Sequence, residues 1–73
     1  MSPALPVVSG VEVVRALAKV GFVRVSQRGS HVKLRHDHGR VAIVPLHKEL
    51  ARGTLRSVLR QAGVSPEELA ALL

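Results

Sequence analysis

A change in the hydrophobic period along the chain constrains its fold more than any other feature. Residues 22–44 alternate between apolar and polar side chains, whereas both flanking segments repeat their apolar residues at helical spacing. Turn signals at Arg28–Ser30 and His36–Gly39 divide the alternating segment into three short runs. Pro45 ends the third run, because proline cannot donate to a strand ladder. The pattern predicts a three-stranded antiparallel meander.

The predicted sheet has one apolar and one polar face, because successive strand residues point to opposite sides. We expect the apolar face to be covered, and it holds Val23, Val25, Val32, Leu34, Val41 and Ile43. We expect the polar face to meet solvent or a partner, and it holds Arg24, Ser26, Arg28, His31, Lys33, Arg35 and Arg40.

Helices are predicted on both sides of the meander. Residues 1–8 form an extended lead-in, and Ser9 then begins a helix as its N-cap, with Glu12 completing a capping box. Gly21 is predicted to end this helix. After an irregular connection over residues 46–52, a second helix follows.

The second helix is predicted to open at Gly53 and Thr54 and to end at Gly63. The letters SPEE at 65–68 begin a short third helix, with serine as the N-cap and proline in the first turn. Two amphipathic helices would cover the apolar face of the sheet. We therefore predict one domain over residues 1–73, an α+β two-layer sandwich with the layout of a double-stranded RNA-binding domain.

The charge balance favours a polyanionic partner. Eleven lysines and arginines oppose five acidic residues, which gives a net charge of +6. Nucleic acid is the first candidate, although a basic surface can also serve only solubility. Cysteine is absent, which excludes disulfides and thiolate metal sites, and we expect a cytoplasmic protein. We expect neither a signal peptide nor a membrane span.

Four histidines are the candidates for chemistry: His31, His36, His38 and His47. His36 and His38 could clip a metal ion beside Asp37, but such pairs in turns are usually solvated, and we predict no metal site or other cofactor. Ser30 and His31 are a poor nucleophile–base pair, because neighbouring strand residues point to opposite faces.

His31 lies between Arg28 and Lys33 in the sequence, and an imidazole beside two cations is the combination that RNA cleavage needs. A ribonuclease without a metal uses a base for the 2′-hydroxyl proton, an acid for the leaving oxygen, and cations for the phosphate. Histidine suits such acid–base work near neutral pH. The residues alone favour the other interpretation, a surface histidine that only begins a strand, because exposed histidines are common and a fold does not fix chemistry.

Several segments together resemble the HicA (YcfA-like) family of mRNA interferase toxins. They are SGVEVVRALAKVGF, RGSHVKLRH, VAIVPLHKEL and RGTLRSVLRQAGVS, and they span the chain from Ser9 onward. The resemblance implies a metal-independent endoribonuclease that cleaves mRNA, and a HicB-like antitoxin that blocks it. It places the catalytic histidine of the G-S-H motif at His31. Many members carry a second histidine next in sequence, where this chain has Val32.

The other site residues are predicted by combining the resemblance with strand geometry. Arg28, Lys33 and Arg35 would hold phosphates, while Gly29 and Ser30 shape the turn, and Ser30 could also donate to substrate. His47 matches the histidine of the V-P-x-H motif and is expected to fix the loop or assist chemistry. Arg24 is a further candidate on the same face.

Two alternatives stay open from the sequence. A non-catalytic RNA-binding module could use the same fold and charge, although the chain lacks aromatic residues for stacking on bases. A plain interaction subunit could instead dock an acidic protein on the polar sheet face. We expect the chain to be a monomer by itself.

Overall fold

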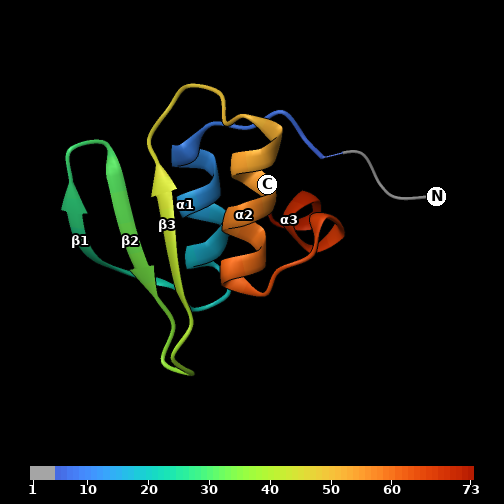
Figure 1. The fold of residues 1–73 in the computed structure, drawn as a ribbon. Coiled ribbons are helices and arrows are strands. Elements are labelled where there is room, and N and C mark those ends of the chain that lie inside the picture. Colours follow the sequence, from blue (N-terminus) through green and yellow to red (C-terminus); the bar gives the residue numbers. More distant parts are fainter. Residues whose placement is uncertain (1–4) are drawn as a thin grey trace.

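The computed structural model describes residues 5–73, so part of the predicted lead-in over residues 1–8 lies outside the described residues. The elements follow the predicted order of helix, three strands, helix and short helix (Figure 1). They are α1 (Gly10–Ala18), β1 (Val23–Arg28), β2 (His31–Arg35), β3 (Val41–Pro45), α2 (Arg52–Ala62) and α3 (Pro66–Leu72). This layout confirms the predicted α+β class. No helix among residues 5–73 has the length and apolar character needed to cross a membrane.

Local sequence signals fix the ends of α1. The Ser9 hydroxyl accepts the Glu12 N–H at 3.1 Å, and the Glu12 carboxylate accepts the Ser9 N–H at 2.9 Å. This reciprocal pair is the predicted capping box. At the other end Gly21 takes φ 100°, and the Phe22 N–H donates to Leu17 at 3.1 Å, as in a Schellman motif.

The later helices are also defined by their capping residues. Ser65 and Glu68 form a second capping box at α3, with Pro66 in the first turn, as predicted. Gly63 ends α2 at φ 69°. The start of α2 differs from the prediction by one residue, since the helix already includes Arg52 and has no side-chain cap.

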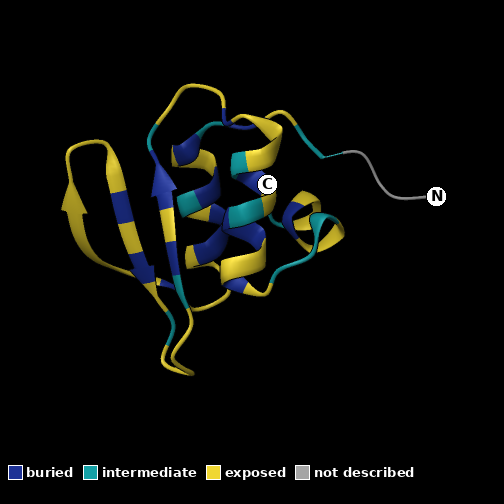
Figure 2. Ribbon diagram, viewed as in Figure 1, coloured by how far each residue is buried: buried dark blue, intermediate teal, exposed yellow. Residues whose placement is uncertain are grey.

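The core lies between the sheet and the helical layer. The three strands pair antiparallel in the order β1-β2-β3, and β3 packs against both α1 and α2. Val32 and Leu34 of β2 are buried against the helices together with Ala42 and Val44 of β3 (Figure 2). The core is almost entirely aliphatic, and Phe22 is its aromatic member.

The predicted facing of β3 is wrong. Ile43, expected in the core, lies opposite Lys33 and is 38% exposed, and Val41 lies opposite Arg35. Residues directly opposite each other on paired strands share a face, so Val41 and Ile43 lie on the outer face. Residues 41–44 are all apolar, so their alternation cannot specify which pair faces the helices.

The prediction that β1 contributes to the core is also wrong. All six residues of β1 are exposed, including Val23 at 63% and Val25 at 50%. β1 is the strand farthest from the helices, as the yellow ribbon in Figure 2 shows. The helical layer covers only β2 and β3, so valines on β1 have nothing to pack against.

A β-bulge between Arg24 and Ser26 changes the facing of the first half of β1. Ser26 lies opposite Lys33, but Arg24 lies opposite the buried Leu34. Arg24 is therefore on the helix-side face, contrary to prediction, because the extra residue of a bulge inverts the alternation. Its guanidinium donates to the Gln27 side chain at 3.2 Å.

Candidate nucleic-acid interface

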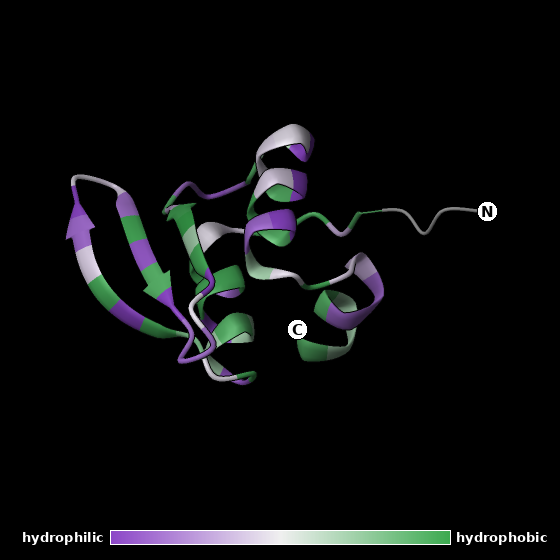
Figure 3. Cartoon of the chain, turned by 60° about the horizontal axis from the view of Figure 1, so that its bottom comes forward, coloured by the Kyte–Doolittle hydropathy of each residue, from purple (hydrophilic) through white to green (hydrophobic). Residues whose placement is uncertain are grey.

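The sheet surface turned away from the helices is called the open face below. β1 contributes Val23, Ser26 and Arg28, β2 contributes His31, Lys33 and Arg35, and β3 contributes Val41 and Ile43. Polar and apolar residues alternate along β1 and β2 in Figure 3, so that β2 presents polar side chains here and apolar ones to the helices.

A hollow of about 360 Å³ lies on the open face. It is lined by Ser26, Arg28, His31, Lys33 and Ile43. An imidazole, two cations and a hydroxyl thus border one depression whose remaining wall is an aliphatic side chain. These lining residues suit a ligand that has both an anionic and an apolar part. Guanidinium and ammonium groups bind phosphate oxygens, and the Ile43 side chain offers an apolar contact.

The hairpin between β1 and β2 brings His31 beside Arg28. The two residues face each other across the two-residue turn formed by Gly29 and Ser30. Gly29 takes φ 57°, a left-handed conformation that glycine adopts without steric cost. The Ser30 carbonyl accepts the Leu46 N–H at 2.7 Å, which fastens the turn to the segment after β3.

The predicted site residues lie in different parts of the structure. Arg28, His31 and Lys33 meet in the hollow. Arg35 shares the open face but lies outside the hollow lining, and Arg24 leaves this face at the bulge. Gly29 and Ser30 form the turn, as predicted.

His47 does not line the hollow. It is exposed in the segment after β3, and its carbonyl accepts the Gly10 N–H at 2.9 Å. This bond joins the start of α1 to the loop that follows β3. Both partners of this hydrogen bond are backbone groups, so the His47 imidazole takes no part in it.

Two lining residues were missing from the predicted site. Ser26 was placed on the polar face but had no assigned role, and its position opposite Lys33 could have suggested one. Ile43 was assigned to the core, and no local signal distinguishes its face within an all-apolar strand. Only the pairing of β3 with β2 puts Ile43 beside Lys33.

The electrostatics around the hollow are uniformly positive. No carboxylate lines it, and the sequence has no acidic residue between Glu12 and Asp37. Cations without local counter-charges attract polyanions and raise their local concentration. The open face can therefore hold a phosphate against His31.

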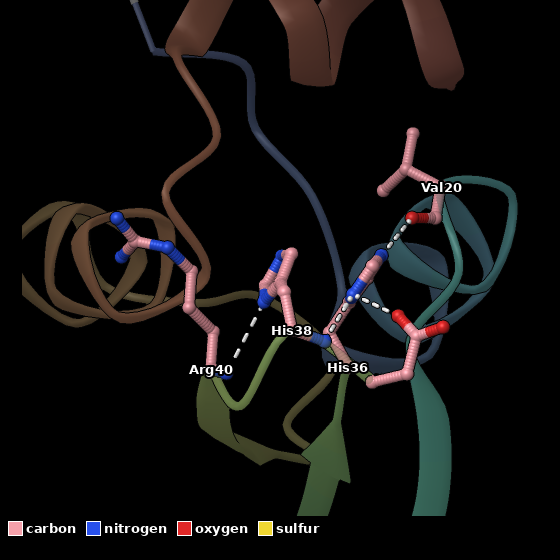
Figure 4. A network of polar contacts seen from close by, with 5 residues as sticks. Val20, His36, His38 and Arg40 are labelled. Carbon is pink, nitrogen blue, oxygen red and sulfur yellow. Dashed lines mark hydrogen bonds and ion pairs between the residues drawn. The ribbon is translucent and has the colours of Figure 1, made fainter.

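The polar contacts of His36 and His38 are structural (Figure 4). Their rings stack with centroids 3.6 Å apart, and both meet the Phe22 ring edge-on. The His36 Nε2–H donates to the Val20 carbonyl at 2.9 Å, and its Nδ1 lies 2.8 Å from Asp37. These contacts tie the turn between β2 and β3 to the end of α1. Among residues 5–73 no three potential metal ligands cluster.

Arg40 was predicted on the polar face but lies against the end of α2. Its guanidinium donates to the Gln61 carbonyl at 3.4 Å and packs against Gly63. A cation at a helix C-terminus meets the negative end of the helix dipole, which favours this placement over the open face.

The chain matches a protein-family model over most of its length. No curated protein matches the chain. The family model of the HicA toxin of bacterial toxin-antitoxin systems matches residues 10–64, from the start of α1 to just beyond α2. This span contains the whole sheet, the G-S-H turn and the hollow. Because the family is the toxin of a toxin-antitoxin system, it implies an antitoxin as a partner. The chain belongs to the HicA toxin family.

Proposed function

We propose that this toxin is an endoribonuclease that cleaves mRNA, with His31 as the general acid or base. The observation that carries the proposal is the hollow in which His31 lies beside Arg28 and Lys33 on an exposed, carboxylate-free surface. Membership of a toxin family supports a destructive activity over a housekeeping one.

In the proposed reaction the RNA strand supplies its own nucleophile. His31 takes the 2′-hydroxyl proton as the 2′-oxygen bonds to phosphorus, and the bond from phosphorus to the 5′-oxygen breaks. The leaving 5′-oxygen takes a proton from imidazolium or water. Arg28 and Lys33 stabilise the charge on the crowded phosphate. The products would be a cyclic 2′,3′-phosphate and a 5′-hydroxyl.

The remaining predicted residues take supporting parts. Gly29 and Ser30 hold His31 at the start of β2, and Ser30 and Ser26 offer hydroxyls to the substrate. Arg35 would contact a phosphate beyond the hollow. His47 is proposed to stabilise the loop, since its backbone carbonyl accepts the Gly10 N–H at the start of α1.

The decisive experiment compares wild-type protein with His31→Ala on a long single-stranded RNA in EDTA and low salt. His47→Ala is the matched control, because it removes an exposed imidazole that does not line the hollow. We expect wild type and His47→Ala to cleave, and His31→Ala to lose about a hundredfold or more of the rate. Cleavage by His31→Ala at the wild-type rate would refute the role of His31.

A non-catalytic RNA-binding module is the second candidate. It is favoured by one observation: the hollow contains a single imidazole and no carboxylate, so a second acid–base group is not evident. In that case RNA would bind without cleavage, His31→Ala would bind as wild type does, and affinity would fall steeply with salt.

A further inference from the structure

The side chains of the open face form rows that follow the strands. His31, Lys33 and Arg35 form a row along β2, because alternate residues of a strand share a face. All three are exposed, while Val32 and Leu34 between them are buried. The bulge of the sheet lies in β1, so nothing interrupts this row. Its successive members are two residues apart, which is about 6.6 Å along a strand.

The cations on this face have no carboxylate partner. The ion pair found among residues 5–73 joins His36 to Asp37, and it does not involve Arg28, Lys33 or Arg35. A guanidinium or ammonium group that has no local counter-charge can bind the oxygens of a phosphate. The row along β2 is therefore a series of unoccupied anion contacts that begins at the histidine of the hollow.

The row on β3 beside it is apolar. Lys33 lies opposite Ile43, and Arg35 lies opposite Val41 (Figure 3). Side chains directly opposite each other on paired strands are about 4.5–5.5 Å apart, so one ligand can contact both rows.

The row on β1 is uncharged over the same length, where Ser26 and Val23 lie opposite Lys33 and Arg35. A polyanion that lies along β2 therefore meets a charged or titratable side chain at every step. One that crosses the strands at Lys33 or Arg35 meets a single cation. The arrangement thus favours the direction along β2.

These rows suit an extended single strand of nucleic acid. The spacing along β2 is close to the distance between successive phosphates of such a strand. Unpaired bases can be splayed out, so they and their sugars can turn toward Val41 and Ile43. A duplex keeps its bases stacked inside and would leave the apolar row without a contact.

We propose that single-stranded RNA runs along β2, with three successive phosphates at His31, Lys33 and Arg35. Its sugars and bases would lie toward Val41 and Ile43 of β3. Arg28 faces His31 across the hairpin and would share the first phosphate. That the phosphate at His31 is the one cleaved rests on the proposed function, whereas the path itself requires only binding.

The test measures binding of the full chain to a single-stranded oligothymidylate over a range of salt concentrations. This probe lacks the 2′-hydroxyl nucleophile, so binding is measured without cleavage. Each phosphate that the protein neutralises on a single strand adds about 0.7 to the slope of log affinity against log salt. We expect Lys33→Gln and Arg35→Gln each to reduce the slope by about 0.7, and the double variant to reduce it by about 1.4.

Arg24→Gln is the matched control. Arg24 is an exposed cation of the same sheet, but it lies opposite the buried Leu34 and therefore on the other face. This variant should keep the wild-type slope, and an equal reduction would mean a diffuse effect of net charge and contradict the proposal. A slope that falls only in the double variant would mean that Lys33 and Arg35 hold one phosphate, which would also overturn it.

A second probe tests where the bases lie. An abasic oligonucleotide with the same number of phosphates should keep the slope but bind several-fold more weakly, because it has no bases to contact Val41 and Ile43. Equal affinity for the two probes would refute the placement of the bases. A base-paired duplex that loses the same slope in Arg35→Gln would refute the preference for a single strand.

The outcomes distinguish this path from the nuclease activity, which is measured separately by cleavage of RNA. Cleavage by wild type together with unchanged slopes in both single variants would overturn the path and leave the nuclease in place. Reduced slopes without any cleavage would support the path and refute the nuclease. Absence of binding at millimolar oligothymidylate and low salt would overturn the path.

Discussion

Gly10 shows how one small residue joins two distant parts of the chain. A side chain at this position would run into the Pro45 carbonyl and lie 2.9 Å from the Leu46 Cα. The close approach lets the Gly10 N–H reach the His47 carbonyl at 2.9 Å. The first turn of α1 is thereby fixed to the end of β3, where the hairpin turn is also fastened.

We predict that Gly10→Ala destabilises the protein by about 1–3 kcal/mol. The new methyl group would meet backbone atoms of Pro45 and Leu46, which cannot move aside as the end of a side chain could. Gly53→Ala is the matched control, since apart from its chain neighbours and the backbone of its own helix no atom lies within 4 Å of the new methyl group. It should stabilise the protein by about 0.5–1 kcal/mol, through the better helix propensity of alanine. Urea unfolding measures both, and equal effects would contradict the close contact.

The helices depend on signals that lie at their ends. At the start of α1 the pKa of Glu12 is lowered from its ordinary value of 4.5. The main cause is the hydrogen bond that the Ser9 N–H donates to the carboxylate, and the second is a hydrogen bond with the Ser9 side chain. The lower pKa in the folded state means that the ionised capping box favours folding. α2 lacks such a cap and relies on packing of its apolar side instead.

The capping box predicts a specific pH dependence. Because the folded pKa is lowered, the contribution of Glu12 is complete above 4.5 and disappears as the pH falls through the folded value. The gap in urea midpoint between wild type and Glu12→Ala should therefore be present at neutral pH and close in acid. Glu49→Ala, an exposed change outside the helices, should show no gap. A gap that persists well below 4.5 would rule out the carboxylate as its source.

For the whole molecule, the main division is between a packed body and a projecting strand. The three helices, β2 and β3 enclose the core, whereas β1 is exposed along its full length. The projecting strand gives the open face its extent, because Ser26 and Arg28 form one wall of the hollow.

The division predicts different costs for the same substitution on neighbouring strands. Val32 is fully buried on β2, so Val32→Thr should cost about 1–3 kcal/mol by burying a hydroxyl without an evident partner. Val25→Thr should stay within about 0.5 kcal/mol, since its site is half exposed. Chemical unfolding of both variants tests this, and a similar cost at Val25 would mean that β1 packs more closely than described.

The sequence by itself determined the elements, most of their ends and the family. Capping boxes, terminal glycines and the two-residue period act within a few residues, so Ser9, Gly21, Gly63 and Ser65 could be interpreted without the fold. The facing of β2 was predictable too, because Val32 and Leu34 alternate with charged residues. That alternation placed His31 and Lys33 correctly on one face.

Only the tertiary structure decided which surfaces the strands share. Ile43 joins the hollow because β3 pairs with β2 in a register that its apolar run does not encode. Arg24 leaves the open face at a bulge, and Val25 stays exposed because the helices reach only the inner two strands. Each of these outcomes depends on how separate elements pair or pack in space, and the local pattern within one element contains no information about it.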